Sequence, residues 1–282
     1  MLQSKPQVAT VLTADKLMAS YAAVAELYGD QPPLSLWRTW EHAVYHGREL
    51  AEPVLDLGCG DSRFFRLLWP NTERVTGCDL DTSILAAARA VDGYPHLTCC
   101  EAASLPFERG TFGTVFSNCV LEHLGEAKPV VSEVLRCLRP EGTFIFSIIT
   151  DKLLDFFESP WSKKASALTD RAKAARAAWT SYHTISRVLS MNDWSEMLHT
   201  CGFEVLEAVG ILPENSARLF LFLDELWHTK TDDGEAGSSI KNYLESQNRF
   251  HEAFAEIVRS FFEMEPAGAA CGGAVFSARK PS

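Results

Sequence analysis

Apolar and polar residues alternate in blocks that predict strands and helices through most of this chain. Short apolar runs bounded by Gly, Pro or Asn are typical of buried strands. Longer stretches place apolar residues on one helical face, as between Ala127 and Leu138. We expect strands at residues 54–57, 75–79, 97–100, 114–117, 143–149, 203–209 and 274–278, and helices at 62–68, 127–138 and 192–200. This alternation predicts an α/β fold whose mostly parallel sheet has helices on both faces.

The first expected strand runs into a glycine turn that carries the most informative chemistry of the chain. Residues 54–60 read Val-Leu-Asp-Leu-Gly-Cys-Gly, so Asp56 lies near the end of the strand. Gly58 and Gly60 allow a sharp turn, and we expect it to leave unpaired N–H groups beside a ligand. A carboxylate here suits a ligand with a cationic amine and not a pyrophosphate. A dinucleotide-binding turn would have a small residue where Arg63 stands.

Asp56-Leu57-Gly58-Cys59-Gly60 resembles motif I of the class I S-adenosylmethionine (SAM)-dependent methyltransferases. Residues 105–107 (Leu-Pro-Phe) and 138–143 (Leu-Arg-Pro-Glu-Gly-Thr) are similar to later motifs of that family. The resemblance covers residues 50–210 and the last strand, and it is to the small-molecule branch (methyltransferase type 11, quinone-biosynthesis-like). It implies a Rossmann-like, seven-stranded sheet, SAM as cofactor and S-adenosylhomocysteine (SAH) as product. The family's Asp after the Phe of the fourth strand is replaced by Gly113, where we expect only a local change.

The resemblance also assigns the cofactor contacts. Asp79 ends the second expected strand and would accept hydrogen bonds from the ribose diol, although NAD enzymes share this feature and a helix N-cap would look the same. Leu80 would pack on the adenine, and Glu101 with Ala102 would hold its amino group. The expected cofactor-binding residues are Asp56, Gly58, Cys59, Gly60, Asp79, Leu80, Glu101, Ala102 and Asn118.

His123 is the first candidate for a catalytic base, because it follows the fourth strand near the expected sulfonium and an imidazole titrates near pH 7. Glu122 would orient it or cap the helix, and His123 would otherwise be a structural residue. His183 is the second candidate. Some quinone-pathway relatives bind a metal through Glu-x-x-Glu-His here, but Cys119 stands in the first position, so we expect no metal.

Aromatic residues outside the core are candidates for the acceptor site. Tyr21, Tyr28, Trp37 and Tyr182, together with His123, are the expected substrate-binding residues. The alternative for each aromatic residue is packing within a helical layer. Tyr21 and Tyr28 have the helical spacing that such packing would produce.

Three segments are not needed for the sheet and predict a helical cap. We divide the chain into an N-terminal cap segment (1–50), the first part of the core (51–150), a cap insertion (151–185), the continued core (186–210), a second helical cap insertion (211–268) and the final strand (269–282). Ligands bind at the carboxyl ends of parallel strands, where such segments would lie. Their many Trp and Phe residues indicate an acceptor that is partly apolar.

Composition excludes some functions. The chain has 26 Lys and Arg against 37 Asp and Glu, a net charge of −11, which argues against a nucleic-acid substrate or an anionic membrane surface. Residues 1–10 have no apolar signal segment, so we expect a cytoplasmic protein. The eight cysteines form no Cys-x-x-Cys pair, which argues against a zinc site of that kind and against a disulfide framework.

Together these observations predict a SAM-dependent methyltransferase that transfers a methyl group to O, N or C of a small acceptor by in-line SN2 displacement. Two alternatives stay open: a SAM-binding protein without catalysis, and an NAD-dependent oxidoreductase on the same type of sheet. We expect a small-molecule partner and either a monomer or a homodimer.

Overall fold

The computed structural model describes residues 12–282 except 92, 159–165, 233 and 247–248, and also leaves out the side chains of residues 166–168, 244 and 245. The expectation for the N-terminal residues 1–10 therefore lies outside the described part, as does the middle of the insertion 151–185. Among the described helices, none has both the length and the apolar content needed to cross a bilayer.

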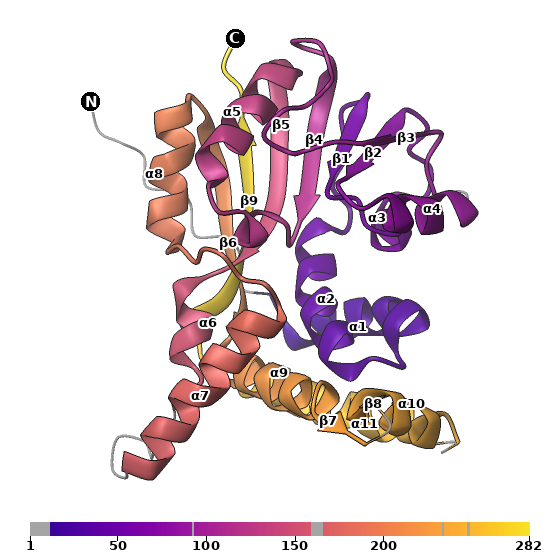
Figure 1. Cartoon of the computed structure of the whole chain (residues 1–282), viewed down its shortest axis with the longest axis vertical. Coiled ribbons are helices and arrows are strands. Elements are labelled where there is room, and N and C mark those ends of the chain that lie inside the picture. The colour runs from indigo at the N-terminus through magenta and orange to yellow at the C-terminus, as the bar shows by residue number, and fades with distance from the viewer. Residues whose placement is uncertain (1–11, 92, 159–165, 233, 247–248) are drawn as a thin grey trace.

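A seven-stranded sheet forms the centre of the molecule (Figure 1). Its strand order is β3-β2-β1-β4-β5-β9-β6, and all neighbours are parallel except β9, which runs antiparallel to β5 and β6. The bounds are β1 Val54–Leu57, β2 Val75–Asp79, β3 His96–Cys99, β4 Phe112–Asn118, β5 Leu138–Ile149, β6 Glu204–Pro213 and β9 Cys271–Arg279. The predicted α/β fold with a mostly parallel sheet is confirmed.

The predicted strands are present, but four begin earlier than expected: β3 at His96, β4 at Phe112, β5 at Leu138 and β9 at Cys271. β4 starts at Phe112 and β5 at Leu138, because these two residues pair before the register shifts between Phe112 and Thr114. The intervening turn is part of β5, with Glu141 at φ 62° followed by Gly142. β4 and β5 are longer than predicted because they pair in the folded chain. The turn residues Arg139-Pro140 do not predict this pairing.

Helices cover both faces of the sheet. α3 (Arg63–Leu68) and α4 (Thr82–Ala90) lie on one face, and α5 (Ala127–Cys137) and α8 (Met191–Cys201) on the other. The side chains of β1 alternate between the two cores, since Val54 packs with Phe65 whereas Leu55 packs with the apolar face of α5. α8 begins with a capping box between Ser190 and Asp193 and ends at Gly202.

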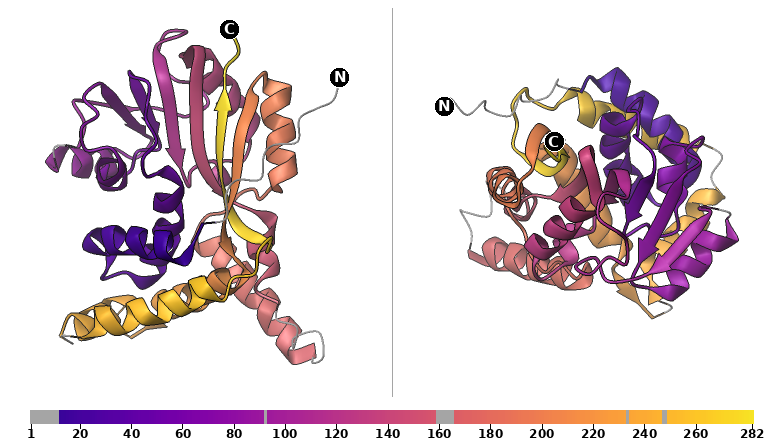
Figure 2. Two further views of the ribbon diagram at one scale, coloured as in Figure 1. Left: turned by 180° about the vertical axis from the view of Figure 1, so that it is seen from behind. Right: turned by 90° about the horizontal axis from the view of Figure 1, so that it is seen from above.

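A second tier of helices lies beyond the carboxyl ends of the parallel strands (Figures 1 and 2). We call this tier the cap. Its helices are α1 (Ala14–Tyr28), α2 (Pro32–Tyr45), α6 (Asp151–Asp155), α7 (Ser166–Tyr182), α9 (Glu214–Trp227), α10 (Ala236–Glu245) and α11 (Phe250–Glu263), and the short strands β7 (Lys230–Thr231) and β8 (Gly234–Glu235) join it.

Aromatic contacts bind the cap helices to one another. Trp37 of α2 packs on Phe220 of α9 with ring centroids 5.2 Å apart, and Trp40 meets Phe262 of α11 edge-on at 5.5 Å. Segments separated by most of the chain therefore share one apolar core. Trp40 belongs to this packing, while Trp37 also faces a cavity.

Gly113 marks a close approach between β4 and the segment before β1. A Cβ added to Gly113 would lie 2.4 Å from the carbonyl oxygen of Ala51, so no side chain fits without a backbone shift. This is the physical reason why this chain cannot carry the Asp that its expected family has here.

We therefore expect Gly113→Ala to lower the free energy of unfolding by about 1–3 kcal/mol, because the new methyl group overpacks a rigid strand. Gly125→Ala is the matched control, since nothing lies within 4 Å of a Cβ at Gly125. Urea unfolding followed by circular dichroism measures both. Equal stability of the two variants would contradict the steric account.

Candidate active site: two adjoining cavities

The turn after β1 is closed by backbone hydrogen bonds. Gly58 and Gly60 have φ of 70° and 54°, a left-handed conformation that favours glycine. The N–H groups of Gly58 and Cys59 donate to the Cys78 carbonyl at 2.8 and 3.0 Å, and that of Gly60 donates to the Asp79 carboxylate at 3.2 Å. The expectation of unpaired N–H groups is wrong, because the turn packs back on the end of β2.

Asp56 is buried beneath this turn and is held by a tyrosine. The Tyr94 hydroxyl donates to its carboxylate, and burial raises the pKa of Asp56 to about 7. Among the described residues, Leu57 and Gly58 line the cavity at this edge of the sheet, and Asp56 is not part of that lining. Nothing in the local sequence around Tyr94 indicated this contact, since the two residues come from different loops and strands.

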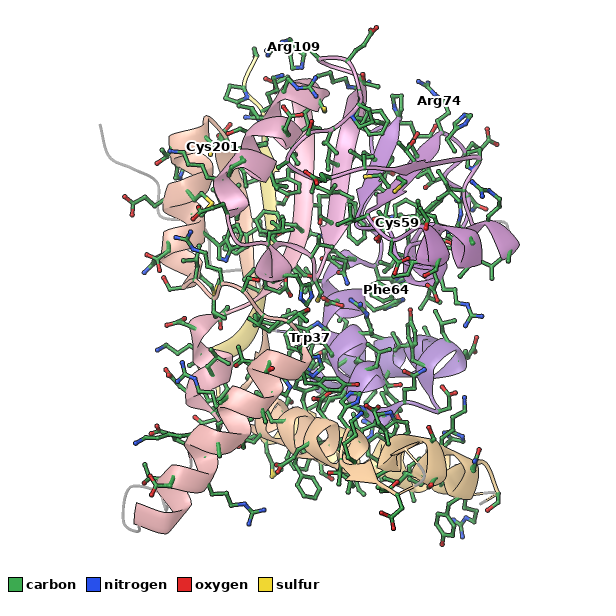
Figure 3. All side chains as sticks on the ribbon, viewed as in Figure 1. Trp37, Cys59, Phe64, Arg74, Arg109 and Cys201 are labelled. Atoms are coloured by element: carbon green, nitrogen blue, oxygen red, sulfur yellow. The ribbon has the colours of Figure 1, made fainter. Side chains whose placement is uncertain are left out.

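A cavity of about 690 Å³ opens at the carboxyl ends of β1, β2 and β4, and we call it the crevice. Six of the nine expected cofactor residues line it, namely Gly58, Asp79, Leu80, Glu101, Ala102 and Asn118. The other three, Asp56, Cys59 and Gly60, lie outside its lining. Leu80 is 68% exposed and Glu101 is exposed as well, so both are free to meet a ligand. In Figure 3, Cys59 lies on the turn between β1 and α3.

A smaller cavity of about 240 Å³ lies between the sheet and the cap, and we call it the cap cavity. Its apolar wall includes Trp37, Ile149, Trp179 and Phe220, and its polar groups are Arg38, Glu122, His123, His183, Asp224 and His228. Arg38, Cys119 and His123 line both cavities. The two spaces are therefore neighbours with a shared wall.

Buried polar contacts of Glu41 hold that wall in place. The Glu41 side chain is fully buried and accepts hydrogen bonds from Ser147 Oγ at 2.7 Å, Asn118 Nδ2 at 3.1 Å and Trp37 Nε1 at 2.9 Å. Arg38 donates to it at 2.6 Å. Trp37, which is labelled in Figure 3, therefore both donates a hydrogen bond to Glu41 and lines the cap cavity.

Glu122 is the acidic group of the cap cavity nearest in sequence to His123. It is 2% exposed, and its Oε2 has no hydrogen-bond partner among the described residues. Burial raises the pKa of Glu122 to about 8. Its backbone carbonyl accepts from Ser186 and Arg187, and the described structure contains no hydrogen bond between its side chain and the His123 ring. Glu122 therefore does not orient His123, contrary to one of the two expectations.

Three polar side chains gather at the cap side of the cap cavity. His183 Nε2 lies 2.8 Å from Asp224 Oδ2, and His228 Nε2 lies 3.5 Å from Asp224 Oδ1. Asp224 is 5% exposed and also accepts a hydrogen bond from Trp179 Nε1 at 2.9 Å. Only His183 of this group was a predicted site residue. The spacing of Asp224 and His228 on one helical face was a usable signal that sequence reasoning missed.

Three of the expected substrate residues lie away from both cavities. Tyr21 is buried against Phe254 of α11, and Tyr28 packs near Phe64. Tyr182 is 45% exposed and donates to Glu235. None of the three lines the crevice or the cap cavity. Tyr21 and Tyr28 instead pack within the helical layer, which was the alternative given for them.

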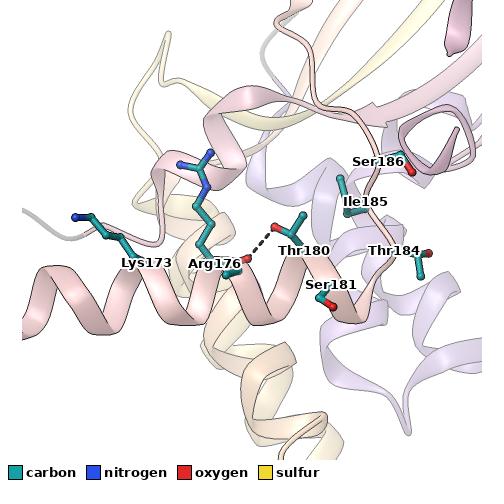
Figure 4. A pocket seen from close by; sticks show the side chains of 8 residues that line it. Lys173, Arg176, Thr180, Ser181, Thr184, Ile185 and Ser186 are labelled. Atoms are coloured by element: carbon teal, nitrogen blue, oxygen red, sulfur yellow. Dashed lines mark hydrogen bonds between the residues drawn. The ribbon is translucent and has the colours of Figure 1, made fainter. Parts of the chain in front are cut away.

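A third hollow runs along the outside of α7 (Figure 4). It is lined by Lys173, Arg176, Thr180, Ser181 and neighbouring residues, and it shares only Ile185 with the cap cavity. It has no contact with the strand ends, so its position does not suit transfer chemistry at the crevice.

All eight cysteines of the chain are free thiols.

Comparison with known proteins identifies the domain to which the crevice belongs. Residues 55–146 match a family model described as a methyltransferase domain. A malonyl-[acyl-carrier protein] O-methyltransferase of Salmonella typhimurium is 29% identical over 128 residues, which are 45% of this chain and 49% of that protein. A probable S-adenosylmethionine-dependent methyltransferase of Mycolicibacterium smegmatis is 31% identical over 160 residues, 56% of this chain and 54% of that protein. The chain spans about half the length of these curated relatives.

A solved structure is similar to this chain in fold. Phosphoethanolamine N-methyltransferase 2 of Haemonchus contortus, solved with phosphomonomethylethanolamine and SAH, superposes with a TM-score of 0.53 at 17% identity. The superposition covers 98% of this chain and 61% of that chain. The likeness shows that the sheet and its flanking helices have the Rossmann-like methyltransferase arrangement.

We expect Glu41→Ala to lower the free energy of unfolding by about 3–5 kcal/mol, because it leaves Arg38 and the polar ends of β4 and β5 without their buried partner. The control is Glu126→Ala, whose side chain is 73% exposed in its ion pair with Arg187 and should change stability by less than about 0.5 kcal/mol. Urea unfolding of the two variants tests this. A comparable loss in both would show that the buried contacts do not stabilise the wall.

Proposed function

We propose that this chain, whose residues 55–146 match a methyltransferase domain, transfers the methyl group of SAM to a small-molecule acceptor held in the cap cavity. The observation that carries the proposal is the pair of adjoining cavities with Arg38, Cys119 and His123 in both linings. An in-line transfer needs the sulfonium and the nucleophile on either side of one short path. The two cavities adjoin at Arg38, Cys119 and His123, so a cofactor in one and an acceptor in the other would meet there.

The cofactor is proposed to lie along the crevice. Asp79 accepts hydrogen bonds from the ribose diol, Leu80 packs on the adenine, and Glu101 with Ala102 contacts the adenine edge. Gly58 and Asn118 lie beside the amino-acid part, and Cys59 and Gly60 shape the turn. Asp56 acts from beneath the turn as a source of negative potential for the cofactor amine.

Arg38 is proposed to pair with the carboxylate of the cofactor. It is the only Lys or Arg among the described residues that line the crevice, and its Nε has no partner in the described structure. Its guanidinium is held by Glu41 at 2.6 Å and lies over the Phe64 ring at 4.9 Å. A cation fixed in this way is preorganised for a carboxylate.

The acceptor is proposed to be small and partly apolar. Trp37, Trp179 and Phe220 supply flat apolar surface, and Glu122, whose buried Oε2 has no hydrogen-bond partner among the described residues, belongs to the lining. With a pKa of about 8, Glu122 is mostly protonated at pH 7. It can therefore both donate to and accept from a hydroxyl or carbonyl of the acceptor.

His123 is proposed as the base where one is needed. Its side chain is exposed to both cavities, and its ring makes no hydrogen bond among the described residues, so its nitrogens are free for the acceptor. Ser186 Oγ donates to its carbonyl at 2.9 Å and steadies the backbone. His183 stays the second candidate, but its Nε2 is directed at Asp224 and it lines the cap cavity alone.

A SAM-binding protein without catalysis is the alternative. That function would be expected to fill the acceptor space with cap side chains. A cap cavity of about 240 Å³ with six ionisable groups of the cap and η1 (Leu121–His123) in its lining supports the enzyme instead.

Asp79→Ala should weaken SAH binding more than about tenfold, because the ribose diol loses both acceptors. Asp155→Ala on α6, which is exposed, is the control and should leave the dissociation constant unchanged. Isothermal titration with SAH and, separately, with NAD measures this. Binding of NAD in place of SAH would overturn the proposed function, and unchanged SAH affinity in Asp79→Ala would remove the ribose assignment.

SAH affinity should rise with pH between about 6 and 8. A carboxyl of pKa about 7 is roughly one-tenth ionised at pH 6 and nine-tenths at pH 8, so an ionised Asp56 that attracts the cofactor amine gives about a tenfold tightening. Asp56→Asn should flatten the profile over this range. Titrations at four pH values test it, and an equal slope in the wild type and the variant would exclude Asp56 as the titrating group.

A further inference from the structure

The His183, Asp224 and His228 cluster has the geometry of a metal site. One ligand atom from each residue can be chosen so that all three lie within 4.8 Å of one another, and the two histidines approach different oxygens of Asp224, His183 Nε2 at 2.8 Å from Oδ2 and His228 Nε2 at 3.5 Å from Oδ1. Two ligands bound about 2.1 Å from a tetrahedral ion lie roughly 3.4 Å apart. Two imidazole nitrogens and one carboxylate oxygen are a donor set that d-block divalent cations favour.

Glu235 determines which nitrogen of His228 carries the proton. His228 Nδ1 lies 3.1 Å from Glu235 Oε2. Glu235 also accepts hydrogen bonds from Lys230 Nζ at 2.7 Å and from the Tyr182 hydroxyl at 3.1 Å, so its contacts are those of a carboxylate that only accepts. His228 Nδ1 must therefore be the donor. A neutral ring then has its lone pair on Nε2, the atom that faces Asp224.

This assignment leaves two acceptors face to face. In the neutral ring, the lone pair of His228 Nε2 faces an Asp224 oxygen 3.5 Å away, and a metal cation between the two atoms would bind both. The ion-pair partners of Asp224 in the described part of the chain are the two histidines alone, while Lys230 is already paired with Glu235. A carboxylate on the outer nitrogen of a metal-binding histidine is a common supporting contact.

We propose that His183 Nε2, Asp224 and His228 Nε2 bind one divalent d-block cation, such as Zn²⁺, at the cap side of the cap cavity. Glu235 orients His228 from behind, and Trp179 orients Asp224 by its 2.9 Å hydrogen bond. The expectation of no metal rested on Cys119 and on cysteine spacing, and neither concerns this cluster.

The site also narrows the class of acceptor, an extension that rests on the proposed function. Three protein ligands leave at least one position of the ion open, as in catalytic zinc sites. All three ligands line the cap cavity, so that position is available to an anionic oxygen of a bound acceptor, such as a carboxylate or phenolate. The cation would anchor that group while His123 and the crevice lie at the other wall.

The test uses the full chain, stripped with a chelator and titrated with ZnCl₂ by calorimetry. We expect one equivalent of Zn²⁺ to bind, His228→Ala and Asp224→Asn to weaken it at least about a hundredfold, and Glu235→Gln to weaken it roughly 10–100-fold. His251→Ala, an exposed histidine on α11, is the matched control and should bind as the wild type does. Cobalt substitution should give no sulfur-to-metal charge-transfer band, which separates this site from the free cysteines.

SAH titration of each variant shows whether it is folded and keeps the two proposals apart. Retained SAH binding with lost Zn²⁺ binding supports the metal site. If the wild type does not bind SAH, the proposed function is wrong, but Zn²⁺ binding can still be measured. No Zn²⁺ binding by the wild type, or binding that survives both His228→Ala and Glu235→Gln, would overturn the inference. The cluster would then be a polar contact between the two histidines and Asp224 without a metal.

Discussion

The buried carboxylate of Glu41 is the contact on which the arrangement of this molecule depends. It comes from α2, a helix of the cap, and its partners Asn118 and Ser147 come from the carboxyl ends of β4 and β5. A buried charge is tolerated only when its oxygens are fully paired, so the helix can dock in one orientation. The same contact aligns Arg38 and Cys119, which form the wall between the two cavities.

The cap does more than cover the strand ends. Its helices supply most of the apolar lining of the cap cavity and the polar cluster around Asp224, while the sheet supplies the turns and acids of the crevice. Removal of water from such a space strengthens every charge interaction within it. The crevice is therefore built mainly by the sheet and its turns, and the cap cavity mainly by the cap.

Two buried carboxyl groups show how burial shapes the chemistry available near neutral pH. Asp56 and Glu122 both have a raised pKa because desolvation disfavours their charged forms. Asp56 keeps a tyrosine hydroxyl as partner, whereas one oxygen of Glu122 has none in the described structure. The first is placed to respond to a cationic ligand, and the second to a ligand with its own hydrogen-bonding group.

The sequence by itself determined the parallel core and most of the crevice. Carboxyl ends of adjacent parallel strands meet at one edge of a sheet, so residues such as Gly58, Asp79 and Glu101 that follow separate strands had to converge. Only the tertiary structure decided the contacts that join distant segments. Tyr94 on Asp56, Glu41 on Ser147, and His183 with Asp224 are far apart in the chain, and their periodicity indicates a helix or strand without indicating a partner. The local sequence pattern indicates which face of a helix or strand is apolar. Packing determines which other element covers that face, and the cap cavity forms only between elements that pack in this way.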